Sequence, residues 1–203
     1  MTRQEFEKAI EEIADETFKR LSGNNPTTPT DGGIIFPKYR NNKVRVSEQE
    51  MRFAFVEELR RLYPEWYYSI ETPTIRKYNF QGEEPKVIEN GQKGGRSAQF
   101  DLTIYKDKKG KEVLAHIEFK AKNPSDPHKY KKDFLKLSED TTGPNTARVF
   151  IHLLESCDDD TVKNLRDEKL KDCKKENVKY LCYSLKEHTV TDPPQEDKHK
   201  IKF

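Results

Sequence analysis

Two acidic residues and a lysine lie on neighbouring segments in which apolar and polar residues alternate. Asp101 belongs to the segment FDLTIY, and Glu118 and Lys120 belong to the segment EVLAHIEFKA. The polar run KDKKGK between these segments predicts a β-hairpin. Because side chains alternate along a strand, we expect all three residues on one face of the hairpin, away from its apolar side chains.

The expected turn places the two acids opposite each other. A two-residue loop at Lys109 and Gly110 would pair Asp101 with Glu118, and side chains in such a pair have Cβ atoms about 4.5–5.5 Å apart. Carboxylates this close repel each other unless one is protonated or a cation lies between them. Mg²⁺ prefers such oxygen ligands. Lys120 would lie beside the metal and stabilise an attacking water or hydroxide, which predicts hydrolysis of a phosphate ester.

Asp101, the hairpin and the run Glu118-Phe119-Lys120 together resemble the signature of the PD-(D/E)XK nuclease superfamily. The resemblance extends to the apolar framing of both strands and to a helix and a strand on either side. It implies a restriction-endonuclease-like αβββαβ core over residues 47–154. It also implies that Asp101, Glu118 and the main-chain carbonyl of Phe119 hold Mg²⁺, for which Mn²⁺ can substitute. Gln99-Phe100 stands where a proline is often found, at a position that varies widely in the superfamily.

A further acid of the site is expected on the helix before the first strand. Ser47 is a candidate N-cap, and Glu50 would complete a capping box with it. Glu48 lies about 60° around the helix from the apolar Met51, and Glu50 lies about 100° away on the other side. Glu48 therefore flanks the buried stripe. The resemblance also favours Glu48, because Holliday-junction-type resolvases of the superfamily place a glutamate in a similar E-x-E-apolar run.

Basic residues near the motif are candidates for binding a nucleic-acid backbone. The segment 123–128 follows the motif directly and opens a helix, whose free N–H groups can bind phosphate. The candidates are Arg96, His128, Lys129, Lys132 and Lys136. A solvated helix face explains each single lysine equally well, and a flexible loop does so for Arg96. His116 shares the face of Glu118, where a satisfied polar neighbour is favoured over a contact to substrate.

The elements that must position these residues follow from the spacing of apolar residues. Helices are expected at 3–21 and 48–63, after Pro127 and after residues 158–160. Strands are expected at 66–74, 100–105, 112–121, 148–154 and 178–185, with a loop or hairpin insertion at 75–98. This order predicts an α/β fold with a central mixed sheet flanked by helices. The expected organisation is an N-terminal helix and irregular arm (1–46), a nuclease-like domain (47–187) and a polar tail (188–203).

Composition excludes several classes of protein. The chain has 203 residues, and its 38 basic residues nearly balance its 36 acidic ones, so any attraction to nucleic acid must be local. No stretch approaches the roughly 20 apolar residues that span a bilayer, and the charged N-terminus does not resemble a signal peptide. Cys157, Cys173 and Cys182 lack the spacing of a disulfide framework or a zinc site. A cytoplasmic protein without a membrane partner is expected.

The expected function is that of a metal-dependent nuclease, with DNA favoured over RNA as substrate. The alternative is an inactive module of the same fold that binds nucleic acid or a protein partner, and the intact acid–acid–lysine set favours the enzyme. Sequence specificity would come from residues 22–46 or 75–98, from a homodimer or from a partner protein.

Overall fold

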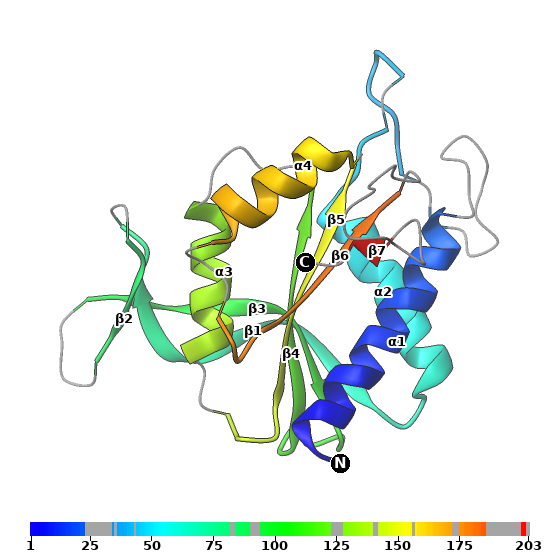
Figure 1. The fold of residues 1–203 in the computed structure, drawn as a ribbon. Coiled ribbons are helices and arrows are strands. Elements are labelled where there is room, and N and C mark those ends of the chain that lie inside the picture. The colour runs from blue at the N-terminus through cyan, green and yellow to red at the C-terminus, as the bar shows by residue number, and fades with distance from the viewer. Residues whose placement is uncertain are drawn as a thin grey trace.

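A mixed β-sheet runs through the centre of the protein in the computed structural model (Figure 1). The structure describes residues 1–22, 34, 36–42, 44–81, 84–89, 94–122, 128–139, 142–155, 157–171, 175–185 and 200–201. The strand order in this seven-stranded sheet is β2-β1-β3-β4-β5-β6-β7. The predicted α/β class with a central mixed sheet is confirmed.

The strands divide into an antiparallel half and a parallel half. They are β1 (Tyr67–Asn79), β2 (Lys86–Ile88), β3 (Arg96–Tyr105), β4 (Val113–Ala121), β5 (Ala147–Leu154), β6 (Lys179–Ser184) and β7 (Lys200–Ile201). β1 pairs antiparallel with β2 and β3, and β3 pairs antiparallel with β4. β4, β5 and β6 are parallel neighbours, and β7 adds an antiparallel edge. Every residue of β5 is buried, as its apolar sequence predicts for a parallel strand that is covered on both faces.

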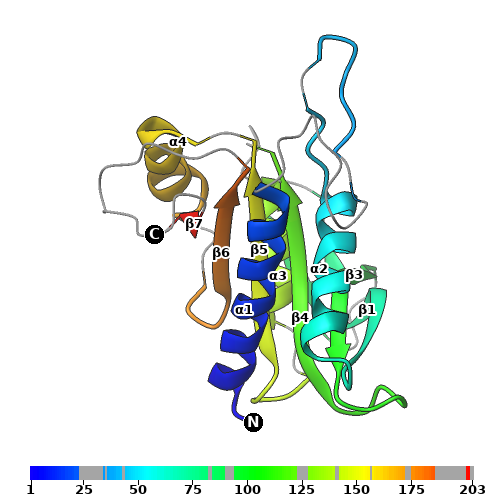
Figure 2. The same ribbon diagram turned by 90° about the vertical axis from the view of Figure 1, so that its right-hand side faces the viewer.

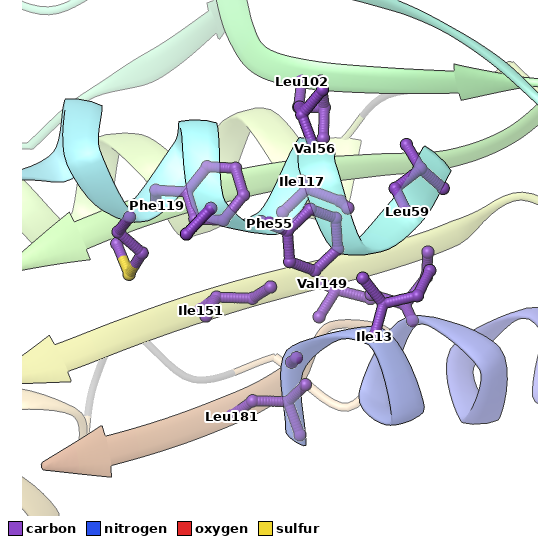
Figure 3. Packing of buried hydrophobic residues seen from close by; sticks show 14 of the residues in the cluster. Ile13, Phe55, Val56, Leu59, Leu102, Ile117, Phe119, Val149, Ile151 and Leu181 are labelled. Atoms are coloured by element: carbon purple, nitrogen blue, oxygen red, sulfur yellow. The ribbon is translucent and has the colours of Figure 1, made fainter. Parts of the chain in front are cut away.

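Helices cover both faces of the sheet. α1 (Arg3–Ser22) and α2 (Glu48–Leu62) lie on one face, and α3 (His128–Glu139) and α4 (Asp159–Asn164) lie on the other (Figures 1 and 2). α4 continues into a π-helical turn at Leu165–Lys169. Figure 3 shows the packing beneath α1 and α2, where the rings of Phe55 and Phe119 meet edge to face, 5.4 Å apart. Beneath α3, Phe134 stacks on Phe150 at 4.7 Å.

α2 begins where the sequence predicts, but the predicted capping box between Ser47 and Glu50 is wrong. Ser47 is the N-cap, with extended backbone angles (φ −139°, ψ 153°), and its side chain makes no capping hydrogen bond. Oε1 of Glu50 instead accepts a hydrogen bond from Arg45 at 2.7 Å. Glu50 therefore turns toward the preceding segment, and Glu48 remains free to point elsewhere.

The β3–β4 hairpin has the predicted register but a different turn. The loop is longer than the two residues expected, because the N–H of Lys106 donates to the carbonyl of Glu112 at 3.0 Å. The carboxylate of Asp107 accepts three main-chain N–H groups within this loop. A register shift between Ile104 and Tyr105 compensates for the longer loop. The pairing farther along the hairpin is therefore the one that the sequence predicts.

Two segments differ from the expected elements. β1 continues to Asn79 and pairs with β2, so part of the predicted insertion at 75–98 extends the sheet. Lys200 and Ile201 of the expected polar tail form β7, where Lys200 Nζ lies 2.7 Å from both Glu11 and Asp15 of α1. Most of the expected arm and tail lies outside the described residues. Within the described part of the chain, no helix is long and apolar enough to cross a membrane.

Candidate active site

β3 and β4 separate at Asp101, and the candidate site lies at this fork. Their pairing ends at Leu102 opposite Ile117, so the next position places Asp101 across from Glu118. Oδ2 of Asp101 accepts a hydrogen bond from the main-chain N–H of Phe119 at 2.8 Å. The N–H of Phe119, which would bond to a main-chain carbonyl of β3 in a continuous ladder, is thus bonded to the side-chain carboxylate of Asp101. β4 continues beside β5, whereas β3 stays with β1 and bends away, as Figure 1 shows.

The backbone around Asp101 departs from regular strand geometry. Glu71 lies directly opposite Asp101 in β1 and has φ 54°, in the left-handed region that side chains disfavour. Leu102 packs in the core beneath α1 and α2, but Phe100 packs in the core beneath α3 and α4. Regular alternation along the segment FDLTIY would place Phe100 and Leu102 on one face, and the structure places them on opposite faces. The regular alternation of the strand is interrupted at the acid itself.

Glu118 is buried beneath α3 and is only 2% exposed. The expectation that this face of the hairpin points away from the core is therefore wrong, because α3 covers it. The Lys136 ammonium lies 2.8 Å from Oε1 of Glu118. That contact is poorly angled, and Oε1 has no hydrogen-bond partner in the described part of the chain. Burial and the nearby Asp133 raise the pKa of Glu118 well above its ordinary value, and Lys136 offsets this only in part.

Lys120 lies between two acids from opposite helical layers. Its ammonium is 3.0 Å from Oδ2 of Asp133 on α3 and 3.6 Å from Oε1 of Glu48 on α2. Burial alone would lower the pKa of Lys120, but the charges of Asp133 and Glu48 outweigh burial and raise it. Lys120 is therefore a protonated cation in this arrangement.

Glu48 is the helix acid that reaches the site. It is the first residue of α2, and its Oε1 accepts a 3.4 Å hydrogen bond from the main-chain N–H of Ala121, directly after Lys120. Burial raises the pKa of Glu48, and the nearby Asp101 raises it further. The structure thus brings together Glu48, Asp101, Glu118 and Lys120, the four side chains that the sequence singled out.

α3 adds two residues to the site whose roles the sequence did not reveal. Asp133 was not singled out, and Lys136 was expected to bind nucleic acid on an exposed face. Lys136 is only 8% exposed, and its ammonium lies 2.9 Å from Asp133 and 3.1 Å from the carbonyl of Gln99. Its expected exposure is therefore wrong. Both residues flank the apolar stripe of α3, and this is the criterion that selected Glu48 on α2.

The other basic candidates lie in different surroundings. Arg96 and Lys132 line an open cleft of about 630 Å³ that also includes Asp101 and Asp133. The ammonium of Lys132 lies 5.8 Å from the centre of the Phe80 ring, which lines the same cleft. His128 and Lys129 begin α3, but their side chains and the segment 123–127 lie outside the described residues. Lys136 lines the same cleft, so three of the five basic candidates lie there beside the acids.

A second cleft of about 470 Å³ lies on the Glu48 side of the cluster. Tyr39, Arg45 and Lys122 contribute an aromatic ring and two cations to its lining. The Lys122 ammonium donates a hydrogen bond to the Tyr39 hydroxyl at 2.8 Å. The acidic cluster therefore has an open cleft with cations and an aromatic ring on either side.

The two buried histidines near the fork are structural. His116 hydrogen-bonds to Thr103 at 2.9 Å and to Thr142 at 2.8 Å, which agrees with the favoured interpretation of a satisfied polar neighbour. Burial lowers the pKa of His152 to about 4. Its neutral ring contacts the carbonyl of Lys122 at 2.8 Å and so supports the end of β4.

The fork fits a hard divalent cation. Within the described residues, no group of three or more His, Cys, Asp or Glu side chains is arranged to hold a metal. Mg²⁺, however, keeps several waters and commonly uses only one or two protein carboxylates. Asp101 and Glu118 supply two, and the Lys136 ammonium 2.8 Å from Oε1 of Glu118 shows that a cation can be held beside this acid. The N–H of Phe119 points to Asp101, so its carbonyl, on the same edge of the strand, points into the fork as well.

Comparison of the chain with protein-family models, with curated proteins and with solved structures finds no match. The function is therefore inferred from the chemistry and geometry of the fork alone.

Proposed function

We propose that the protein is a metal-dependent nuclease with a restriction-endonuclease-like core, and that it hydrolyses phosphodiester bonds, preferentially in DNA. The observation that carries this proposal is the buried Glu118 across from the half-buried Asp101 at a fork in the sheet, with the protonated Lys120 two residues farther along β4. Acids withdrawn from water are costly for a fold even when cations lie beside them. Their presence at an open cleft therefore favours a functional role.

The order of elements supports the proposed core. α2 precedes β1, β3 and β4, and α3 and β5 follow, with the short β2 inserted after β1. This order corresponds to the αβββαβ pattern that the resemblance implies. The acids and the lysine lie on the second and third strands of that pattern, where the superfamily carries its motif.

In this proposal Asp101, Glu118 and the carbonyl of Phe119 hold the metal. When bound, Mg²⁺ neutralises the phosphate and lowers the pKa of a coordinated water. Glu48 contributes from the end of α2, directly or through a water molecule. Mn²⁺ can substitute because it accepts the same oxygen ligands.

Lys120 acts as a fixed positive charge. A lysine that removes a proton from water must first lose its own proton, and the raised pKa of Lys120 opposes this. Asp133 holds the ammonium at 3.0 Å, and Glu48 steadies it at 3.6 Å. A cation held beforehand in this way stabilises negative charge as it develops on an attacking hydroxide or on the phosphate.

The clefts beside the cluster favour a polynucleotide over a small phosphate ester. Arg96 and Lys132 on one side, and Arg45 and Lys122 on the other, can contact phosphates along a chain. Phe80 and Tyr39 offer one ring on each side for stacking with a base. A strand that runs through both clefts crosses the fork, which predicts cleavage within a chain.

The first test is incubation of the purified protein with linear, circular, branched and single-stranded DNA, and with RNA, in the presence of Mg²⁺ or Mn²⁺. The proposal predicts cleavage of at least one DNA that stops when EDTA removes the metal. Cleavage that continues in EDTA would contradict it. Cleavage of RNA alone would correct the substrate and leave the mechanism in place.

One observation favours the alternative of a binding module without catalysis. The Lys136 ammonium already lies against Glu118, so the buried acid has a cation in the absence of metal. Calorimetric titration separates the two functions, since the nuclease must bind Mg²⁺ or Mn²⁺ and the module need not do so.

A further inference from the structure

Lys136 belongs to the acidic cluster and not to the surface of α3. Its ammonium lies 2.8 Å from Glu118, 2.9 Å from Asp133 and 3.1 Å from the carbonyl of Gln99. The side chain is almost completely buried. An ammonium held by two carboxylates and a carbonyl occupies the kind of oxygen-rich surroundings that a metal cation also prefers.

The contacts form a continuous chain of alternating charges across the site. Glu118 contacts Lys136, Lys136 contacts Asp133, and Asp133 contacts Lys120. Glu48 completes the chain at the far side of Lys120. Asp133 therefore links the lysine of the motif to the lysine of α3, and both cations depend on it for their position.

One feature distinguishes the contact to Glu118 from the contact to Asp133. Lys136 and Asp133 are three residues apart on one helix, so α3 itself keeps them together. Glu118 lies on a different element, so no shared helix keeps it beside Lys136. The Glu118 contact is therefore the one that can be given up when another cation arrives.

We propose that Lys136 is a built-in counter-ion of this site, which neutralises Glu118 before metal binds and gives up that contact when a divalent cation takes its place. Lys136 is thus a positioning residue and has no direct role in hydrolysis. The second half of this proposal rests on the proposed function, because it requires that the site bind a metal. The first half concerns the metal-free protein and stands independently.

Thermal unfolding in EDTA tests the first half. The variants are Lys136→Met, Glu118→Gln and the double variant, measured at mildly alkaline pH. Removing the cation alone leaves a buried acid unpaired, so Lys136→Met should lower the unfolding midpoint. The double variant should recover a large part of this loss, because it has neither charge. If the decreases in unfolding midpoint of the two single variants simply add in the double variant, Lys136 and Glu118 do not interact. That result would overturn the claim that Lys136 neutralises Glu118.

Calorimetric titration with Mn²⁺ tests the second half. Lys136→Met should bind Mn²⁺ about tenfold more tightly or better, because a nearby positive charge that opposes the ion is gone. Lys136→Arg keeps the charge and should bind like the wild type. The control is Lys108→Met, which removes an exposed lysine from the loop of the hairpin that carries Glu118. Its affinity should not change.

The outcomes separate this inference from the proposed function. Equal or weaker Mn²⁺ binding by Lys136→Met, with binding by the wild type intact, would overturn the exchange of Lys136 for metal and leave the nuclease in place. Absence of Mn²⁺ binding in all variants, the wild type included, would contradict both the nuclease and the exchange. The unfolding experiment would still decide whether Lys136 neutralises Glu118.

Discussion

At the scale of single residues, the pKa of Lys120 is set by the acids beside it more than by its burial. Asp133 contacts its ammonium at 3.0 Å, and together with Glu48 this acid outweighs the effect of burial on the pKa of Lys120. A residue that works as a cation can be replaced by another cation, whereas a proton acceptor cannot be replaced by arginine, which stays protonated.

Lys120→Arg should therefore retain measurable cleavage, about tenfold to a hundredfold below the wild type because the guanidinium is larger. Asp133→Asn should also reduce cleavage, because Lys120 loses its nearest partner. Single-turnover cleavage rates check both. Complete inactivity of Lys120→Arg, with the fold intact by circular dichroism, would favour proton transfer by Lys120.

The acids of the fork predict how metal binding depends on pH. Burial raises the pKa values of Asp101, Glu48 and Glu118 above their ordinary values of 3.8, 4.5 and 4.5. A raised pKa means that the folded, metal-free protein binds these protons more tightly than the unfolded chain does. This contribution to stability is present at low pH and is lost as pH rises through the folded pKa values.

The stabilisation by Mn²⁺ should therefore grow as pH rises, since protons compete with the metal below the raised pKa values. The measurement is the shift in unfolding midpoint that Mn²⁺ causes across a pH series. Glu118→Gln is the control and should show a smaller shift with a weaker pH dependence. A wild-type shift that is the same at every pH above 4.5 would contradict the raised pKa values of these acids.

At the scale of elements, α3 decides where the polar residues of the site lie. Phe134 and Leu137 face the sheet, and the stack of Phe134 on Phe150 is nearly parallel, with 6° between the rings. Asp133 precedes Phe134 directly and reaches Lys120 only while the helix keeps this rotation.

Phe134→Ala should lower the free energy of unfolding by about 3–5 kcal/mol because it removes a buried ring. It should also reduce cleavage where the protein is still folded, because Asp133 and Lys136 lose their placement. Urea denaturation and cleavage rates check the two effects. Phe53→Ala is the control on α2, since that ring is 56% exposed and its loss should have little effect. Full activity in a destabilised Phe134→Ala would contradict the positioning role of α3.

The sequence predicted most elements, and the exceptions have physical causes. Apolar spacing located α1, α2 and β5 to within a residue or two, because those residues are buried. The assumed two-residue turn placed Asp101 opposite Glu118, and the observed register agrees with this pairing. The turn between them was not predictable, because a carboxylate at Asp107 closes a longer loop and a register shift then compensates. Rules that relate loop length to strand register predict neither the longer loop nor the register shift.

The site was predictable as far as one hairpin and one helix end define it. Glu48 could be chosen because it flanks the stripe of α2. Asp133 and Lys136 flank the stripe of α3 in the same way, but the sequence did not show that α3 would cover the polar face of the hairpin. Lys136 therefore looked like one solvated lysine among several. Which face a helix covers is set by packing between elements that are distant in sequence.

At the scale of the whole molecule, the near balance of 38 basic and 36 acidic residues is compatible with a nucleic-acid substrate. The acids gather at the fork, whereas Arg96, Lys132, Arg45 and Lys122 line the clefts on either side. A path with few cations predicts modest affinity that depends only weakly on salt but strongly on the divalent ion. The expected homodimer or partner protein stays a prediction, as does the cytoplasmic location.

Phe80→Ala should weaken binding of single-stranded DNA about fivefold to a hundredfold if a base stacks on this ring. Fluorescence anisotropy in EDTA measures binding without cleavage. Ile75→Ala is the control, because Ile75 is 67% exposed on β1 and does not line either cleft. An equal loss of DNA affinity in both variants would show that no base stacks on Phe80.

The most direct test of the nuclease is the cleavage of DNA by Lys120→Ala beside the wild type in Mg²⁺ or Mn²⁺. Lys108→Ala, in the exposed loop of the same hairpin, is the matched control. The nuclease predicts that Lys120→Ala folds like the wild type and loses cleavage by at least about a hundredfold, whereas Lys108→Ala cleaves normally. Cleavage by Lys120→Ala at the wild-type rate would contradict the assignment of the fork as the active site.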